Sequence, residues 1–122
     1  MNKKFVIWKR SFDIPVVFDV YDGEEILDEQ ETSLTSFISK SEELLNNPSY
    51  LSNYLVETSN GKVTDPIDNI FKYVLPKSLF VKRIKDKRVI ALLCAYKYDP
   101  EHGLAVVFEN EAFSKVTTEA NV

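Results

Sequence analysis

One apolar segment, Val89 to Tyr96, constrains the fold of this chain more than any other feature. All eight of its residues are apolar or aromatic, whereas a strand with one face in water alternates apolar and polar residues. The segment is far shorter than the roughly 20 residues that a membrane-spanning helix needs. A second apolar run, Leu104 to Glu109, follows after a polar turn that contains Gly103. The pattern predicts a β-hairpin whose first strand lies in the middle of a sheet and is covered on both faces.

Further strand patterns occur at both ends of the chain. At the N-terminus, Phe5–Phe12 and Val16–Tyr21 read as two strands joined by a turn at Asp13–Pro15. In the second of these strands, alternate apolar residues share one face, which is typical of a strand exposed on its other side. The C-terminal half predicts four strands: Leu79–Ile84, Arg88–Tyr98, Leu104–Glu109 and a weaker one at Phe113–Thr117.

The middle of the chain predicts three helices. Asp28 is in a position to cap the first, with Glu31 three residues later as in a capping box. Asn47-Pro48 and Asp65-Pro66 begin the second and third, because proline is well tolerated in the first helical turn. Pro76 ends the third helix.

The order of these elements predicts an α+β fold. We expect an antiparallel sheet, made of an N-terminal β-hairpin and a C-terminal four-stranded meander, packed by about three helices. With 122 residues, the chain forms one domain, 1–122, that buries roughly two-thirds of its unfolded surface. A single cysteine forms no internal disulfide, which favours a reducing, cytoplasmic location.

The charges are unevenly distributed along the sequence. The formal net charge is −4, yet eight acidic residues and no Lys or Arg lie between Ser11 and Ser39, and seven basic residues and one acid lie between Lys72 and Arg88. An acidic surface speeds association with a basic protein, although acids near a helix start also form ordinary solvated faces. We take these residues as the candidate partner-binding set: Asp19, Tyr21, Asp22, Glu24, Glu25, Asp28 and Glu29.

The basic run Lys82–Arg88 reads as a hairpin with a charged tip. An acidic pI of about 5.0 and the lack of a recognisable set of base-stacking aromatics argue against nucleic acid as a partner. No apolar stretch is long enough for a membrane anchor, so we expect no membrane partner either.

The turn before Leu104 holds the only histidine of the chain. Carboxylates and imidazole can bind zinc, but the side chains of a tight turn diverge and no second histidine is present. We interpret Asp99, Glu101, His102 and Gly103 as a structural turn. We therefore predict no metal site and no cofactor.

A thiol–imidazole pair also fails on distance. If Tyr98 faces Leu104 across the predicted hairpin, Cys94 faces Phe108 and lies roughly 13 Å from the turn that carries His102. Hydrogen bonding between a nucleophile and its base requires about 3 Å. With few glycines and one histidine, the chain offers no other catalytic pattern, and we predict that it is not an enzyme.

The same turn carries a family resemblance. Tyr98-Asp99-Pro100-Glu101-His102-Gly103 resembles a (Trp/Tyr)-Asp-x-Glu-His-Gly hairpin in a family of small, uncharacterised bacterial domains, with Tyr98 where tryptophan is usual. Members of that family resemble proteins proposed as immunity factors beside bacterial toxins, in toxin–antitoxin or contact-dependent inhibition systems. The resemblance implies an immunity protein that acts by stoichiometric binding to a basic toxin domain. The alternative is a housekeeping or structural module that forms a homodimer through a sheet edge near Phe113–Thr117.

Overall fold

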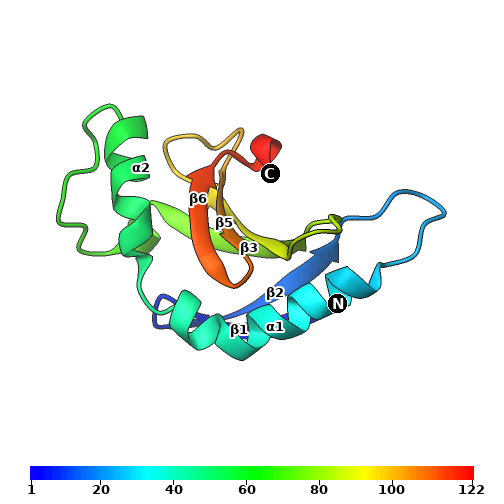
Figure 1. The fold of residues 1–122 in the computed structure, drawn as a ribbon. Coiled ribbons are helices and arrows are strands. Elements are labelled where there is room, and N and C mark those ends of the chain that lie inside the picture. The colour runs from blue at the N-terminus through cyan, green and yellow to red at the C-terminus, as the bar shows by residue number, and fades with distance from the viewer.

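The computed structural model describes residues 1–122 as one six-stranded sheet with two α-helices on it (Figure 1). The strands lie in the sheet in the same order as in the sequence. The α+β class predicted from the sequence is confirmed. The elements are β1 (Asn2–Ile7), β2 (Arg10–Phe18), α1 (Asp28–Leu44), α2 (Ser52–Thr58), β3 (Val74–Val81), β4 (Val89–Tyr96), β5 (Leu104–Glu109) and β6 (Ala112–Thr117), with short 3₁₀ turns η1 (Pro48–Leu51), η2 (Ile70–Lys72) and η3 (Glu119–Asn121).

The sheet is mixed, so the prediction of a purely antiparallel sheet is wrong. β2 pairs with β3 in parallel, through Val16–Phe18 alongside Leu79–Val81, and every other neighbouring pair is antiparallel. The reason lies in the long connection between these two strands, which carries both α-helices. A parallel pair needs such a crossover, and here it returns the chain to the end of the sheet at which β2 began.

The prediction of three helices is also wrong, because the third segment forms a single 3₁₀ turn. The side chain of Asn69 accepts a hydrogen bond from the N–H of Phe71, and only the three residues of η2 follow this cap. The chain then extends into β3. Pro76 lies inside this strand, next to a register irregularity, where a missing N–H does little harm.

The N-terminal hairpin turns at Trp8-Lys9 and not at Asp13–Pro15. Both turn residues have positive φ angles, 50° and 71°, as a two-residue hairpin turn requires. Sequence rules assign such positions to asparagine and glycine, so this turn escapes prediction. Trp8 is held by two hydrogen bonds, from its backbone N–H to the Leu45 carbonyl at 2.7 Å and from its indole Nε1 to the Tyr50 hydroxyl at 2.9 Å.

The hairpin between β4 and β5 has a longer turn than predicted. Cys94 pairs with Leu104 and Ile90 with Phe108, so the predicted register is wrong. Tyr98 leaves the ladder because its ring packs on the rings of neighbouring tyrosines, with 6.0 Å between centroids. The turn therefore spans the residues from 97 to 103.

The core lies between the sheet and the helices. Leu34 and Phe37 of α1 and Leu55 of α2 belong to one buried cluster of 22 residues on this face. A smaller cluster of β4 and β5 residues, on the opposite face, packs against Phe80, Ile84, Leu93 and Val122. The helices thus cover one face of β4, and on the other face its residues Val89 and Ala91 pack with side chains that include Phe80, Ile84 and Val122. No helix has the length and apolar composition needed to cross a membrane.

Candidate functional site

The residues from 19 to 29, which we call the acidic loop, comprise the connection between β2 and α1 and the first two residues of α1, and they project beyond the sheet (Figure 1). Three apolar side chains in it are exposed to solvent: Tyr21 to 73%, Ile26 to 41% and Val20 to 40%. Exposed apolar side chains this close together are unusual on a loop and mark a candidate contact surface.

Gln30, at the start of α1, ties the two ends of the acidic loop together. Its side chain is buried, and its Nε2 donates to the carbonyls of Asp19 at 3.0 Å and Val81 at 3.2 Å. Its Oε1 accepts from the N–H of Leu27 at 3.0 Å. This contact caps α1 in place of the predicted cap at Asp28, because the residue three positions after Leu27 is the glutamine.

Arg83 holds the middle of the acidic loop from the adjacent β3–β4 connection. Its backbone N–H donates to Asp19 Oδ2 at 3.1 Å, and its guanidinium donates to the Glu25 carbonyl at 2.9 Å. The same guanidinium lies 3.3 Å from a carboxylate oxygen of Glu24. The other oxygen of Glu24 accepts from the N–H of Tyr21, which closes a turn inside the loop. The acidic loop therefore has a defined conformation.

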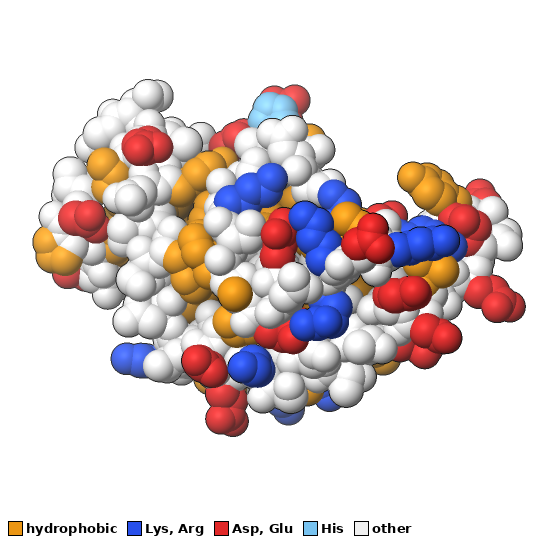
Figure 2. Space-filling model, in the orientation of Figure 1, with side chains coloured by type: hydrophobic (Ala, Val, Ile, Leu, Met, Phe, Trp, Pro, Cys, Tyr) orange, Lys and Arg blue, Asp and Glu red, His pale blue; other side chains and the backbone are white.

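The structure brings the predicted acidic residues together and pairs one of them with a basic side chain. Glu24 forms an ion pair with Arg83, Asp19 accepts only the backbone N–H of Arg83, and the other four carboxylates form no ion pair. Figure 2 shows acidic side chains gathered on and below the projecting loop, with basic side chains directly beside them. The carboxylates that stay free are Asp22, Glu25, Asp28 and Glu29.

The basic run lies next to the acidic one in space, although the two are far apart in sequence. A cleft of about 260 Å³ separates the first turn of α1 from the β3–β4 connection, and all seven of its lining residues are polar or charged. Two of its basic side chains are already paired, Lys87 with Glu109 at 3.6 Å and Arg88 with Glu111 at 2.7 Å. The lining residues are Asp28, Glu29, Thr32, Lys85, Asp86, Lys87 and Arg88.

The histidine turn is closed by one carboxylate. Asp99 Oδ1 accepts from the backbone N–H of His102 at 3.2 Å and lies 2.9 Å from its Nδ1. This hydrogen bond, with the charges of Asp99 and Glu101, raises the pKa of His102 above its ordinary value. No group of three or more His, Cys, Asp and Glu residues is arranged to hold a metal ion.

Gly103 sits where the turn meets the central strand. Its φ is +62°, and a Cβ at this position would lie 2.6 Å from the Cys94 carbonyl and 2.8 Å from Glu119 Oε1. Cys94 itself is fully buried, and burial strongly raises the pKa of its thiol. A buried, protonated thiol is a poor nucleophile.

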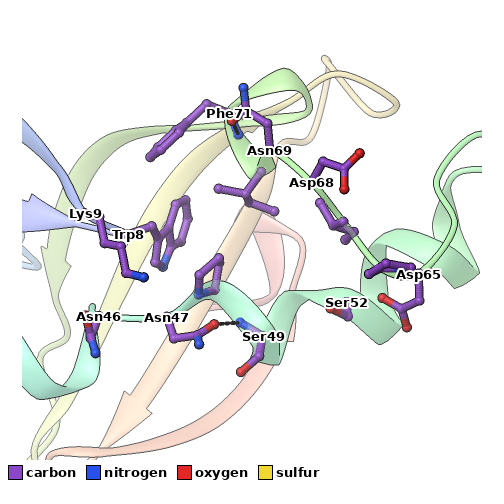
Figure 3. A pocket seen from close by; sticks show the side chains of 14 residues that line it. Trp8, Lys9, Asn46, Asn47, Ser49, Ser52, Asp65, Asp68, Asn69 and Phe71 are labelled. Carbon is purple, nitrogen blue, oxygen red and sulfur yellow. Dashed lines mark hydrogen bonds between the residues drawn. The ribbon is translucent and has the colours of Figure 1, made fainter.

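One cavity was not predicted from the sequence. It has a volume of about 400 Å³ and lies between the Trp8-Lys9 turn, the chain that leads into α2, and the segment from 65 to 71 (Figure 3). We call it the polar cavity, because most of its lining side chains are polar. No sequence pattern indicates this cavity, since Trp8 and Lys9 read as part of a strand. The lining residues are Trp8, Lys9, Asn46, Asn47, Pro48, Ser49, Ser52, Asp65, Pro66, Ile67, Asp68, Asn69, Ile70 and Phe71.

A family model described as a domain of unknown function (DUF6985) matches residues 2–121. The chain belongs to the DUF6985 family. The matched residues include the whole sheet, both helices, the acidic loop and the polar cavity. No curated protein and no solved structure matches the chain. Membership in DUF6985 agrees with the predicted likeness to an uncharacterised domain family, while the hairpin motif and the toxin-immunity link stay predictions.

Proposed function

We propose that this chain is a non-catalytic binding protein of the immunity type, which neutralises a bacterial toxin by stoichiometric binding through the acidic loop. One observation carries the proposal. Tyr21 and Ile26 are exposed among four unpaired carboxylates, on a loop that Gln30 and Arg83 hold in one conformation.

These properties are those of a protein-binding surface. Tyrosine is over-represented among the residues that contribute most to binding, because its large ring buries apolar area and its hydroxyl keeps a polar partner. A loop with a fixed conformation loses little entropy when it binds. The unpaired carboxylates at Asp22, Glu25, Asp28 and Glu29 favour a basic partner and accelerate encounter with it.

A toxin that acts on nucleic acid fits this surface well. Such an enzyme must be basic to hold a polyanion, and an inhibitor that offers carboxylates can occupy the same basic groove. The proposal rests on the acidic loop and on the family resemblance described for the histidine turn.

The test is charge reversal on the acidic loop, with the product of the adjacent gene as the candidate toxin partner. The double variant Glu25→Lys and Glu29→Lys, and separately Tyr21→Ala, should weaken binding at least about tenfold and abolish protection of toxin-exposed cells. The matched control is Glu42→Lys with Glu43→Lys, which makes the same charge change on exposed positions near the end of α1. Full protection by both loop variants would refute the acidic loop as the binding surface.

Self-association is the second candidate function, favoured by β6. This edge strand, Ala112–Thr117, has no neighbour on its outer side, and its Phe113 is 42% exposed. An unprotected edge can pair with the same edge of a second chain. Light scattering should then show a concentration-dependent dimer that Ser114→Lys disrupts, and a monomer at all concentrations would exclude this candidate.

A further inference from the structure

The polar cavity lies at the other end of β2 from the acidic loop. β2 begins at Arg10, directly after the Trp8-Lys9 turn that lines the cavity, and ends at Phe18, directly before the loop. The cavity volume of about 400 Å³ falls in the range typical of small-molecule sites. It can therefore hold a ligand without contact to the acidic loop.

Three charged side chains line this cavity, and none of them forms an ion pair. These are Lys9, Asp65 and Asp68. Figure 3 shows the amine of Lys9 at one end of the cavity and the carboxylate of Asp65 at the other. Opposite charges at the two ends complement a ligand that carries both.

The polar groups near Lys9 are suited to a carboxylate. The Oδ1 atom of Asn47 accepts from the N–H of Ser49 at 3.0 Å, which leaves its amide N–H groups to donate elsewhere. Asn46 and Asn47 both lie close to Lys9 in Figure 3. An ammonium group with amide N–H donors beside it forms strong, charge-assisted hydrogen bonds to a carboxylate.

The opposite end is suited to a cation. Asp65 and Ser52 both line the cavity, so a carboxylate and a hydroxyl oxygen are both available as acceptors (Figure 3). Pro48, Ile67 and Ile70 contribute apolar area to the lining. A short aliphatic chain can pack there between the charged groups of a ligand.

The aromatic residues of the cavity do not offer a stacking surface. Trp8 is only 4% exposed, and its ring packs against that of Phe71 at 5.9 Å between centroids. Phe71 in turn has the guanidinium of Arg10 over its face at 4.5 Å. Ligands that depend on an open aromatic face, such as sugars and nucleobases, are therefore poorly matched.

The Trp8-Lys9 turn presents Lys9 to solvent at the rim of the cavity. Trp8 and Lys9 both have positive φ angles, as the residues of the β5–β6 hairpin turn, Asn110 and Glu111, also do. The contacts of Trp8 with the core fix this turn, whereas Lys9 is exposed and makes no ion pair. The amine of Lys9 is therefore available to a ligand.

From these observations we propose that the polar cavity binds a free basic amino acid of the lysine or arginine type. The ligand carboxylate meets Lys9 and Asn47, its side-chain cation meets Asp65, and its aliphatic chain lies against Pro48 and Ile67. The amine of Lys9 and the carboxylate of Asp65 thus match the carboxylate and the side-chain cation of the ligand.

Calorimetric titration of the whole chain with matched small molecules tests the ligand class. L-Lysine or L-arginine should bind, and two analogues should bind at least about tenfold more weakly. L-Norleucine keeps the aliphatic chain but lacks the terminal ammonium, and 1,5-diaminopentane lacks the carboxylate. Equal binding of either analogue, or no binding by lysine and arginine, would overturn the proposal. Tighter binding of Nα-acetyl-L-lysine than of L-lysine would overturn the free amino acid in favour of a peptide end.

Two variants test the assigned contacts. Asp65→Asn should remove the preference for lysine over norleucine, while Asp86→Asn, at an exposed aspartate outside the cavity, should keep it. Lys9→Gly should abolish binding without loss of stability, because glycine accepts the φ of 71° at this position without strain. Unchanged affinity in Lys9→Gly would contradict the assigned carboxylate contact, and the melting temperature shows whether that variant is folded.

Discussion

Replacement of Gly103 by alanine tests the packing of the histidine turn against the sheet. An alanine Cβ would lie 2.6 Å from the Cys94 carbonyl and 2.8 Å from Glu119 Oε1, closer than real Cβ atoms approach such neighbours. The Cys94 carbonyl cannot withdraw easily, because it belongs to the backbone of the central strand β4. Glu119 Oε1 ends a side chain that pairs with Lys77 at 2.6 Å, so its displacement would disturb that ion pair.

The expected loss has two parts. The positive φ of +62° costs an L-residue about 1–2 kcal/mol, of which about 0.4–1 kcal/mol is regained because alanine restricts the unfolded chain. The forced contact adds roughly 1–3 kcal/mol, as overpacking does in protein cores. Gly103→Ala should therefore lower the free energy of unfolding by about 2–4 kcal/mol.

Gly23→Ala is the matched control, because Gly23 has a φ of +82° and no atom within 4 Å of the added Cβ. It should lose about 1 kcal/mol or less, since only the backbone terms apply. Urea unfolding followed by the fluorescence of the single tryptophan, which is buried, measures both variants. Equal losses in the two variants would refute the argument that close contact makes glycine necessary at position 103.

Three further predictions follow from side-chain contacts. Gln30→Leu should lower the free energy of unfolding by about 2–4 kcal/mol in urea, because two carbonyls lose their buried donor; a loss within error of zero would contradict this. The pKa of His102, measured by NMR, should lie above 6.5 and return toward it in Asp99→Asn. Because the folded pKa is raised, this contact stabilises the turn fully below pH 6.5 and is lost as the pH rises through the folded pKa; an unshifted pKa would contradict the contact. Cys94, which is fully buried with a raised pKa, should react with a thiol reagent only after unfolding, and rapid reaction of the native protein would exclude that burial.

The sequence predicts best where a local pattern decides the structure. The strand Leu104–Glu109 has the predicted bounds, because an apolar run between a glycine turn and an asparagine turn leaves few alternatives. The strand at Val89–Tyr96 is likewise present, since its apolar residues must be buried on both faces. Local patterns also place the helix at Asp28–Leu44.

Prediction from the sequence fails where contacts between residues far apart in the chain determine the structure. The Trp8-Lys9 turn violates local turn preferences and is held in place by Leu45 and Tyr50, which come much later in the chain. The parallel pairing of β2 with β3 depends on how the crossover packs, and Pro76 is accepted in a strand because of a nearby irregularity. No short window of sequence contains this information.

The candidate sites also combine features that a local sequence pattern predicts with features that depend on distant contacts. Charge counting identifies the acidic loop, but it misses Arg83, whose contact with Asp19 joins residues 64 positions apart. It also misses Gln30, which reads as an ordinary helix residue and is in fact buried against two carbonyls. The polar cavity is assembled from three separate segments, so none of its residues stands out in the linear sequence.

The parallel contact between β2 and β3 also bears on synthesis of the chain. β1 and β2 leave the ribosome first, but the strand that completes their sheet ends at Val81. Until that residue emerges, β2 presents an unpaired edge and Val16 has no cross-strand neighbour there. The β3–β6 meander pairs adjacent segments and needs no such wait. The first-made strands therefore keep an unpaired edge while the whole crossover is being synthesised, and the newborn chain is most prone to aggregation during this interval.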